Sequence, residues 1–223
     1  MELKEVISKV DHTLLKPVST WEQIQALCEE AISYGTASVC IPPSFVKRAK
    51  SKYGSQIPIC TVIGFPLGYN TTQIKVAEVK DAIANGASEV DMVVNLGDVK
   101  EGNFEKVTEE IRALKEAAGD KVLKVIIETC YLTDDEKIAL CNCVTEAKAD
   151  YIKTSTGFGS GGATLADIEL IKKHIGTNVK IKASGGIRIK EDFEAFVNAG
   201  CQRLGTSSVI QAYRASGSAE GDY

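Results

Sequence analysis

Residues 89–95 read EVDMVVN, and this stretch decides the fold class. Apart from Glu89, Asp91 and Asn95, it is a continuous apolar run. Strands of a parallel sheet are buried on both faces and read in this way, as nearly unbroken Val, Ile and Leu. Because side chains alternate along a strand with a period of two, Asp91 and Asn95 share one side with Val93. The stretch therefore predicts a buried parallel strand that carries a carboxylate on one face.

Seven further apolar runs of strand length lie on either side of this one, separated by stretches of helical period. The eight predicted strands are 10–13, 37–41, 57–63, 89–95, 122–128, 151–154, 179–183 and 203–206. Strands that alternate with helices predict an α/β fold with a parallel sheet covered by helices. Eight such units predict a TIM (β/α)8 barrel, formed as a single domain by residues 1–223 and compact beside a typical length of about 250 residues. The alternative is an open doubly wound sheet, which more often has about five or six strands.

The stretches between the strands carry helical periodicity. The predicted helices are 19–33, 43–53, 69–85, 103–118, 133–147, 164–175 and 190–199. The clearest is 103–118, where apolar residues recur at steps of three and four: Phe104, Val107, Ile111, Leu114 and Ala118. Gly119 is expected to end this helix, and Ser19 or Thr20 to cap the first one.

The charge balance is slightly acidic, since 26 basic and 30 acidic residues give a net charge of −4 and a pI near 5.4. A surface that binds nucleic acid or an anionic membrane is therefore not expected. No run reaches the ~18 apolar residues of a membrane span, and charges interrupt residues 1–17, where a signal peptide would be apolar. Seven cysteines without a CxxC pair predict reduced thiols in a cytoplasmic protein. Two histidines exclude a histidine-rich metal site, which leaves open only a carboxylate site for a hard cation.

Charged side chains interrupt several predicted strands on the side that must face the barrel interior, because the apolar side can pack against the helices. Besides Asp91, these are Lys124, Glu128, Lys153 and Lys182. Burying a charge costs several kcal/mol unless it is paired, so one interpretation is a structural network in which the two carboxylates neutralise the three lysines. The charges fall, however, at or near the carboxyl ends of strands four to seven, where catalytic residues of such barrels lie. We therefore favour an active site.

Buried, clustered lysines favour covalent chemistry on a carbonyl group. Neighbouring ammonium groups and burial both lower a lysine pKa, from about 10.4 towards about 7–8, where the neutral amine is available to attack a carbonyl. A Schiff base also needs a neighbouring group that moves protons. Lys153, Lys182 and Asp91 supply these parts without a metal or a cofactor.

Small residues after three predicted strands favour phosphate binding. Residues 157–162 read GFGSGG, Gly185 and Gly186 follow strand seven, and residues 205–208 read GTSS after strand eight. Backbone N–H groups of such loops approach an anion closely, and these barrels often bind phosphate after strands seven and eight. The alternative is that they are tight turns only. GFGSGG also matches the dinucleotide pattern GxGxxG, but no acidic residue follows about 20 positions later, which argues against a nicotinamide enzyme.

The remaining polar residues near these segments have plainer interpretations. A lone histidine such as His12 is more often structural, and His174 lies late in a helix, where it suits the C-terminal end. Cys40 ends strand two within reach of the site, but a packing thiol is the simpler interpretation. Asp11 and Thr13 are expected to line the barrel mouth.

Six segments, spread through the whole barrel and in family order, resemble the signature segments of the deoxyribose-phosphate aldolase family. They are DHTLLKP at 11–17, VDMVVNLG at 90–97, KVIIETCYL at 124–132, YIKTSTGFG at 151–159, IKASGGIR at 181–188 and LGTSS at 204–208. The resemblance implies a class I aldolase that reversibly cleaves 2-deoxy-D-ribose 5-phosphate to acetaldehyde and D-glyceraldehyde 3-phosphate. The residues by themselves indicate an imine-forming lysine and a phosphate site, but not this substrate.

The resemblance also implies a role for each matching residue. Lys153 corresponds to the Schiff-base lysine, Asp91 to the proton donor and acceptor, and Lys182 to the lysine that perturbs Lys153 and joins the proton relay. Lys124 corresponds to a supporting lysine in that relay. The positions implied to bind the phosphosugar are Gly157, Gly185, Gly186, Gly205, Ser207 and Ser208. A homo-oligomer, dimer or tetramer, is implied as well.

Two parts of the chain qualify this transfer. Some family members carry a lysine where this chain has Phe158, so one contact to the polar end of the substrate is expected to be absent or replaced. Residues 215–223, ASGSAEGDY, are small and polar and predict a mobile C-terminal tail. The last residue, Tyr223, resembles a tail tyrosine that assists proton transfer, and we expect the same role here.

Two other functions fit the same residues. A phosphosugar isomerase or epimerase would use Asp91 as a base without a covalent adduct. A phosphometabolite-binding protein would use the lysines only to neutralise the charge of its ligand. Trapping of an imine by borohydride separates the aldolase from both.

Overall fold

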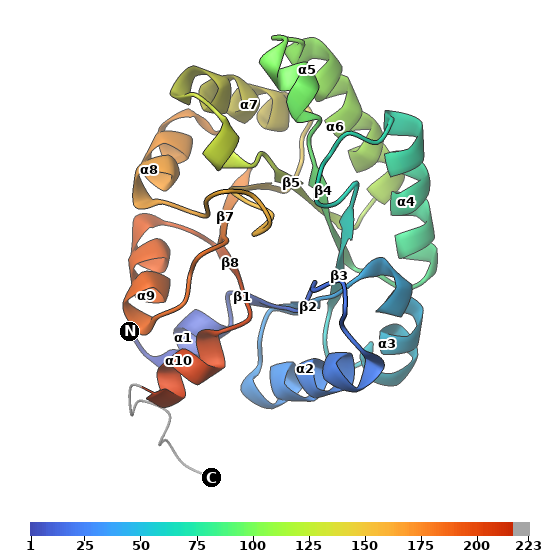
Figure 1. Ribbon diagram of the computed structural model, residues 1–223, viewed down its shortest axis with the longest axis vertical. Coiled ribbons are helices and arrows are strands. Elements are labelled where there is room, and N and C mark those ends of the chain that lie inside the picture. The colour runs from blue at the N-terminus through green and yellow to red at the C-terminus, as the bar shows by residue number, and fades with distance from the viewer. Residues whose placement is uncertain (216–223) are drawn as a thin grey trace.

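The computed structural model describes residues 1–215 and contains a closed barrel of eight parallel strands ringed by helices (Figure 1). Each strand pairs with the next along the chain, and the last pairs with the first. The strands are β1 (Val10–Thr13), β2 (Ser38–Cys40), β3 (Ile59–Ile63), β4 (Glu89–Val93), β5 (Val122–Ile126), β6 (Tyr151–Lys153), β7 (Lys180–Ser184) and β8 (Arg203–Thr206). The predicted TIM barrel is confirmed, and the open doubly wound sheet is wrong because β1 and β8 close the ring.

Helices cover the outside of this ring. They are α1 (Leu3–Ile7), α2 (Trp21–Tyr34), α3 (Val46–Tyr53), α4 (Thr72–Ala84), α5 (Leu96–Lys100), α6 (Phe104–Ala118), α7 (Asp134–Glu146), α8 (Leu165–His174), α9 (Lys190–Ala199) and α10 (Val209–Ala215), with 3-10 turns η1 (Pro43–Phe45) and η2 (Thr129–Tyr131). Every predicted helix is present, although 43–53 is divided between η1 and α3. The short helices α1, α5 and α10 were not predicted, because five to seven residues are too few to show a helical period. No helix within residues 1–215 is long and apolar enough to cross a membrane.

Local hydrogen bonds set the helix boundaries. The Thr20 side chain accepts a hydrogen bond from the N–H of Gln23, and the Gln23 side chain accepts one from the N–H of Thr20, which forms a capping box at the start of α2. Thr133 and Glu136 form the same box at α7. Gly119 ends α6, as its sequence predicted. These side chains explain why most helix ends lie within a few residues of the predicted positions.

Two strands end two residues earlier than predicted, and polar residues at their carboxyl ends are the reason. β4 ends at Val93 because Asn95 caps α5, its Oδ1 accepting a hydrogen bond from the N–H of Gly97 at 3.0 Å. β5 ends at Ile126 because Glu128 adopts the left-handed conformation, with a φ of 53° that no strand accommodates. These polar residues therefore belong to loops at the carboxyl end of the barrel.

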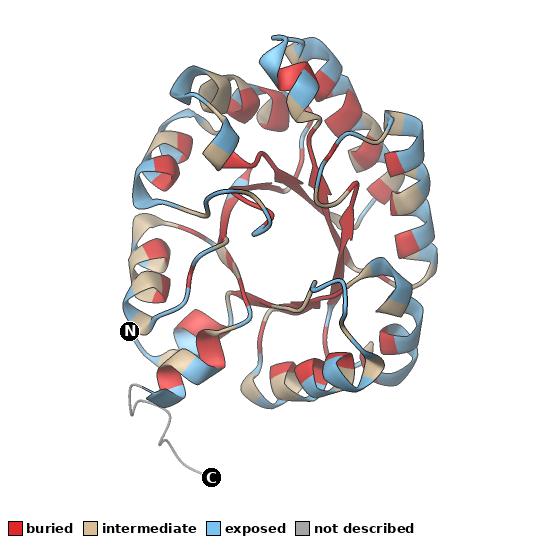
Figure 2. Ribbon diagram, viewed as in Figure 1, coloured by how far each residue is buried: buried red, intermediate tan, exposed pale blue. Residues whose placement is uncertain are grey.

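The two sides of each strand have different surroundings, although Figure 2 shows most of the ring of strands buried. Val90 and Met92, on either side of Asp91 in sequence, belong to the main apolar core between strands and helices. A separate small cluster contains Cys40, Cys60 and Val62, packed against Leu15 and Phe65. The barrel interior thus has an apolar wall along β2 and β3, while charged side chains enter it from other strands.

A buried ion pair outside the barrel ties two helices to the strand that carries Asp91. Lys75 of α4 is fully buried, and its Nζ lies 2.8 Å from Glu110 Oε2 on α6. The same ammonium group donates a hydrogen bond to the carbonyl oxygen of Val93 at 2.9 Å. Since this oxygen is at the end of β4, the pair fixes α4 and α6 against the carboxyl end of that strand.

Candidate active site

Asp91, on β4, is fully buried and binds all three lysines that the sequence singled out. Lys153 Nζ and Lys182 Nζ donate to Asp91 Oδ2 at 2.8 and 2.7 Å, and Lys124 Nζ donates to Oδ1 at 2.8 Å. Strand register explains the meeting, because Asp91 is paired with Lys124 across β4 and β5, and Lys153 with Lys182 across β6 and β7. The structure therefore brings together the three residues predicted to be catalytic and the supporting lysine.

Three further charged residues complete the network. Arg203 donates hydrogen bonds to Asp11 and, at 2.9 Å, to Glu89 Oε2. Lys182 Nζ donates to Asp11 Oδ2, and Lys124 Nζ lies 2.5 Å from Glu89 Oε2. Three carboxylates, those of Asp91, Asp11 and Glu89, thus contact four cations, so the interior retains one positive charge that the network does not neutralise.

Asp11, Glu89 and Arg203 were not predicted as members of this network, although the sequence carries a signal for them. Asp11 was expected to line the barrel mouth; it is instead fully buried and paired with Gly205 across β1 and β8. Glu89 shares one side of its strand with Asp91, by the same period of two that identified Asp91. Arg203 lies opposite Lys182 in the register of β7 and β8. Alternation along β1, β4 and β8 would have found all three.

One interpretation of the sequence, a structural network in which Glu128 neutralises the lysines together with Asp91, is wrong for Glu128. Its left-handed backbone takes it out of the β5 ladder. Its Oε1 accepts a hydrogen bond from the N–H of Thr156 at 3.1 Å, and its Oε2 accepts one from the Thr156 hydroxyl. The Thr156 hydroxyl oxygen in turn accepts from the N–H of Phe158 at 3.0 Å. Glu128 is therefore the anchor of the loop that follows β6.

The charges of the network shift the pKa values of Asp91, Lys124 and Lys182. Burial opposes ionisation of Asp91, but the ammonium groups of Lys124, Lys153 and Lys182 outweigh it and hold its pKa well below the ordinary value. Burial lowers the pKa of Lys182, but the carboxylates of Asp11 and Asp91 prevail and raise it; Lys124 is raised in the same way. The expectation that clustering lowers lysine pKa values is therefore wrong for Lys124 and Lys182. Near neutral pH, Asp91 is ionised and both of these lysines are protonated.

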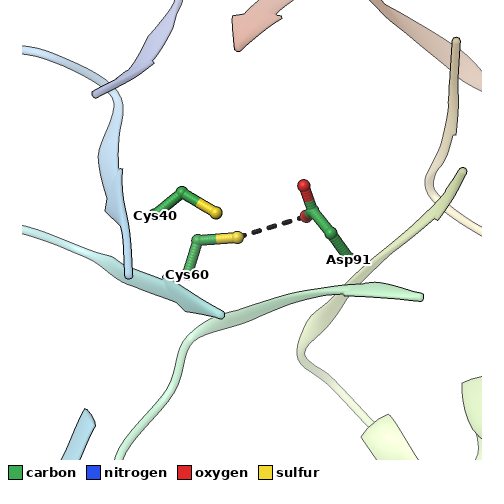
Figure 3. Close-up of side chains that lie close together, drawn as sticks. All are labelled: Cys40, Cys60 and Asp91. Atoms are coloured by element: carbon green, nitrogen blue, oxygen red, sulfur yellow. Dashed lines mark hydrogen bonds between the residues drawn. The ribbon is translucent and has the colours of Figure 1, made fainter. Parts of the chain in front are cut away.

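Two thiols face the same carboxylate. Cys40 and Cys60 are paired across β2 and β3, and Figure 3 shows both pointing towards Asp91. Burial raises the pKa of Cys60 well above its ordinary value, so this group is a neutral thiol that donates to Asp91 Oδ1 at 3.1 Å. Ligand atoms of Cys40, Cys60 and Asp91 lie within 4.8 Å of one another, as do those of Asp11, Cys60 and Glu89. Because all three carboxylates already bind lysine or arginine, a metal ion there would have to displace these cations.

A cavity of about 630 Å³ lies beside this network. Of the charged residues bound to one another in the barrel interior, Lys153 alone is among the described residues that line it. All six positions predicted to bind the phosphosugar line it as well: Gly157, Gly185, Gly186, Gly205, Ser207 and Ser208. A ligand in this cavity thus meets the amine of Lys153 in the same space as the small residues of the loops after β6, β7 and β8.

Two of the small residues are required by packing. A Cβ on Gly205 would lie 3.1 Å from Lys182 Cε and 2.9 Å from Ser184 Cβ, so glycine on β8 leaves room for the lysine. A Cβ on Gly162 would lie 2.2 Å from the carbonyl oxygen of Gly185, which means that the loops after β6 and β7 pack backbone against backbone. These glycines shape the cavity whatever ligand occupies it.

Other residues that the sequence singled out lie around the site or away from it. His12 is buried with its Nε2 2.9 Å from Glu30 Oε2, and no polar group of the catalytic network contacts it. Thr13 lines the cavity, as expected for the barrel mouth. Phe158 also lines it, is 52% exposed, and packs edge-on against Phe65 with ring centroids 5.3 Å apart. The loop after β6 therefore presents an aromatic ring here.

Residues 216–223 of the predicted C-terminal tail, which include Tyr223, lie outside the described residues, so the mobility of the tail stays a prediction. Ala215, the first residue of the predicted tail, is described and is the last residue of α10. The role expected of Tyr223 stays a prediction.

Known proteins resemble this chain over nearly its whole length. A family model described as DeoC/LacD family aldolase matches residues 5–217. A deoxyribose-phosphate aldolase from Clostridium botulinum is 62% identical over 210 residues, 94% of this chain and 95% of that protein. A crystal structure of a proposed deoxyribose-phosphate aldolase from Coccidioides immitis has a TM-score of 0.92 and 42% identity, and the match covers 97% of this chain and 87% of that one. The tetrameric deoxyribose phosphate aldolase from Aeropyrum pernix has a TM-score of 0.87 and 29% identity, covering 97% and 92%. The chain therefore belongs to the DeoC/LacD family of aldolases and is a carbon–carbon lyase.

Proposed function

We propose that this chain, as one barrel domain over residues 1–223, reversibly cleaves 2-deoxy-D-ribose 5-phosphate to acetaldehyde and D-glyceraldehyde 3-phosphate through an imine on Lys153. One observation carries the proposal: of the three lysines bound to Asp91, Lys153 is the one that lines the cavity. Its amine is next to an ionised carboxylate, which can accept a proton, and it borders a cavity that a substrate carbonyl can enter. A nucleophilic amine needs both. The names of the relatives support the substrate.

The first half of the reaction forms the imine. Neutral Lys153 attacks C1 of the open-chain sugar and gives a carbinolamine. Asp91, ionised at rest and 2.8 Å from Lys153 Nζ, takes the proton that the amine sheds. Protonated Lys182 lies 2.7 Å from the same carboxylate oxygen and passes a proton towards the hydroxyl group that leaves as water. An iminium ion then links Lys153 to C1.

The second half breaks the carbon–carbon bond. The iminium ion withdraws the electron pair of the C2–C3 bond while the C3 hydroxyl loses its proton, so that C3 becomes the carbonyl carbon of glyceraldehyde 3-phosphate. C2 keeps the electron pair as an enamine and is then protonated to a methyl group. Water hydrolyses the imine, which releases acetaldehyde and free Lys153. The pair of Asp91 and Lys182 supplies and recovers these protons, with Lys124 holding the second oxygen of Asp91. Tyr223 is proposed to assist protonation of the enamine.

The phosphate group is proposed to bind at the small residues of the cavity. The positions are Gly157, Gly185, Gly186, Gly205, Ser207 and Ser208. They lie after β6 and β7 and at the end of β8 or just after it, and short side chains there let backbone N–H groups approach an anion.

The isomerase alternative fits the geometry less well. It requires Asp91 to take a proton from a carbon atom of the substrate, but Asp91 is fully buried and is not among the residues that line the cavity. A direct contact between its carboxylate and a sugar carbon would need the lysines to move aside. The imine route requires only that the substrate reach Lys153.

We also propose a homo-oligomer, a dimer or a tetramer. The Aeropyrum pernix relative is tetrameric, which supports the proposal.

Trapping with acetaldehyde and sodium borohydride tests the function. We expect a reduced ethyl adduct on the peptide that contains Lys153, identified by mass spectrometry, and turnover of 2-deoxy-D-ribose 5-phosphate by the same preparation. Lys153→Met should lose both, because no other lysine bound to Asp91 lines the cavity. Lys80→Met, which changes an exposed lysine of α4, is the matched control and should keep both.

Two outcomes would overturn the proposal. Folded wild-type protein without an adduct would exclude the covalent mechanism, and turnover of sugar phosphate isomers by that protein would favour the isomerase. An adduct on Lys182 in place of Lys153 would show that Lys153 is not the nucleophile.

A further inference from the structure

The outer part of the active-site cavity has a strong bias towards positive charge. Its described lining residues include Lys16, Arg188 and, at the inner end, Lys153, but no aspartate or glutamate. The chain as a whole has a net charge of −4, so this bias is local. A cavity lined by cations alone favours an anionic ligand.

Lys16 has a fixed backbone and a free side chain. It lies in the connection between β1 and α2, where its carbonyl oxygen accepts hydrogen bonds from the N–H and the hydroxyl of Ser19, at 3.0 and 2.8 Å. At the start of the same connection, the N–H of Leu14 donates to the carbonyl oxygen of Cys40 at 2.9 Å. Within residues 1–215, no carboxylate pairs with the exposed ammonium group of Lys16. The charge is therefore held near the cavity and available to a ligand.

Barrel topology places Lys16 beside the proposed phosphate site. β7, β8 and β1 are consecutive neighbours in the ring, as Figure 1 shows. The loop after β8 carries Ser207 and Ser208, so it lies between the loop after β7, with Arg188, and the loop after β1, with Lys16. An anion at the two serines would thus have one cationic side chain on each side. The loop after β6 contributes no cation to the lining, because Phe158 stands there.

We propose that Lys16 is a specificity-determining residue whose ammonium group pairs with the terminal phosphate of the substrate. The inference rests on the proposed function and extends it: the chain selects phosphorylated over unphosphorylated aldehydes through a cation from the first βα loop. Lys16 acts on binding and not on the reacting carbon, which lies at Lys153.

The test compares Lys16→Met with Lys80→Met as the matched control. For Lys16→Met, we expect the KM for 2-deoxy-D-ribose 5-phosphate to rise about tenfold with kcat nearly unchanged, because an exposed charge-assisted hydrogen bond to phosphate is lost. Turnover of unphosphorylated 2-deoxyribose should stay at the wild-type level. Inorganic phosphate should bind more weakly to Lys16→Met by a similar factor in a calorimetric titration, and Lys16→Arg should restore most of the loss.

The outcomes separate this inference from the proposed function. Wild-type KM and wild-type phosphate binding in Lys16→Met would overturn the role of Lys16 while leaving the aldolase in place. An equal loss with both the phosphorylated and the unphosphorylated sugar would overturn it as well, since the effect would not depend on phosphate. If the wild-type protein turned over neither sugar, the proposed function would be wrong. The phosphate titrations of Lys16→Met and Lys80→Met would still decide whether Lys16 binds the anion.

Discussion

Asp91 holds three ammonium groups with two oxygen atoms. Lys153 and Lys182 share Oδ2, and Lys124 binds Oδ1, at distances from 2.7 to 2.8 Å. All four side chains are at most 4% exposed, so water cannot replace a lost partner. Removing one member of a buried ion pair leaves an uncompensated charge, which costs more than the pair itself contributes. We therefore expect Asp91 to contribute to stability in addition to the proton transfer proposed for it.

Asp91→Asn keeps the shape of the side chain and removes its charge. We expect a loss of about 3–5 kcal/mol in the free energy of unfolding at pH 7 and a fall in kcat of about 10²–10⁴. Urea unfolding and steady-state turnover measure the two effects. Asp120→Asn is the control, because Asp120 is 85% exposed and, among residues 1–215, pairs only with its neighbour Lys121. A variant at Asp91 with the unfolding midpoint of the wild type would contradict this account of the network.

The loop between β6 and α8 has no regular secondary structure, yet it forms one side of the cavity. Glu128 binds it at Thr156, and the N–H of Ala163 donates to the carbonyl oxygens of Ser184 and Gly185, both at 3.1 Å. In Figure 1 this segment, coloured gold, curls inward over the ring of strands. Its position thus depends on side chains and backbone groups from the ends of β5 and β7, together with its own Thr156 and Gly162.

Glu128→Ala should release this loop. The buried N–H and hydroxyl of Thr156 would lose their acceptors, for a cost of about 1–3 kcal/mol in the free energy of unfolding. We expect the KM for the phosphorylated substrate to rise, while borohydride trapping of acetaldehyde on Lys153 persists. Glu128→Gln, which keeps one acceptor and one donor, should bring both the free energy of unfolding and the KM most of the way back to the wild-type values. Glu169→Ala, an exposed change on α8, is the control, and a wild-type KM in Glu128→Ala would show that Glu128 does not position the loop.

The pKa values of four buried groups in the barrel interior are shifted in directions that stabilise the fold over a defined pH range. Lysine and arginine side chains outweigh the burial that opposes ionisation of Asp11 and Asp91, and lower both pKa values. Such groups contribute stability above their ordinary value of about 3.9, and this is lost as the pH falls through the folded-state pKa. Lys124 and Lys182, whose pKa values the carboxylates raise, contribute stability below about 10.4, and this is lost as the pH rises through the folded-state pKa.

As the pH rises, ionisation of buried thiols should reduce the free energy of unfolding at a lower pH than deprotonation of the lysines does. Burial raises the pKa of Cys28 to about 11, and those of Cys141 and Cys201 to about 12. The unfolded chain ionises its thiols from about pH 8.5, so the free energy of unfolding should be nearly constant between about pH 4 and 8 and fall above about pH 8.5. Urea midpoints measured across this range provide the test, with Cys141→Ala expected to give a shallower alkaline decline. A steady loss of stability between pH 8 and 5 would contradict the prediction.

Much of the barrel and part of the site could be predicted from the sequence because both depend on local patterns. Periods of two and of 3.6 identified all eight strands and the seven longer helices, since burial of one face imposes these periods on any strand or helix. The same period of two predicted that Asp91, Lys124, Lys153 and Lys182 lie in the interior, because a charge that interrupts an otherwise apolar strand must lie on the side away from the helices.

The sequence by itself determined that Asp91, Lys124, Lys153 and Lys182 enter the barrel, and only the tertiary structure decided which of them touch and that Glu128 does not join them. Glu128 carries the same charge as Asp91, but its left-handed backbone directs it to Thr156. Asp11 and Lys182 are separated by 171 residues and meet because β1 and β8 close the ring. The directions of the pKa shifts of Lys124 and Lys182 follow from these partners, since Coulomb energy depends on distances between atoms that no sequence period specifies.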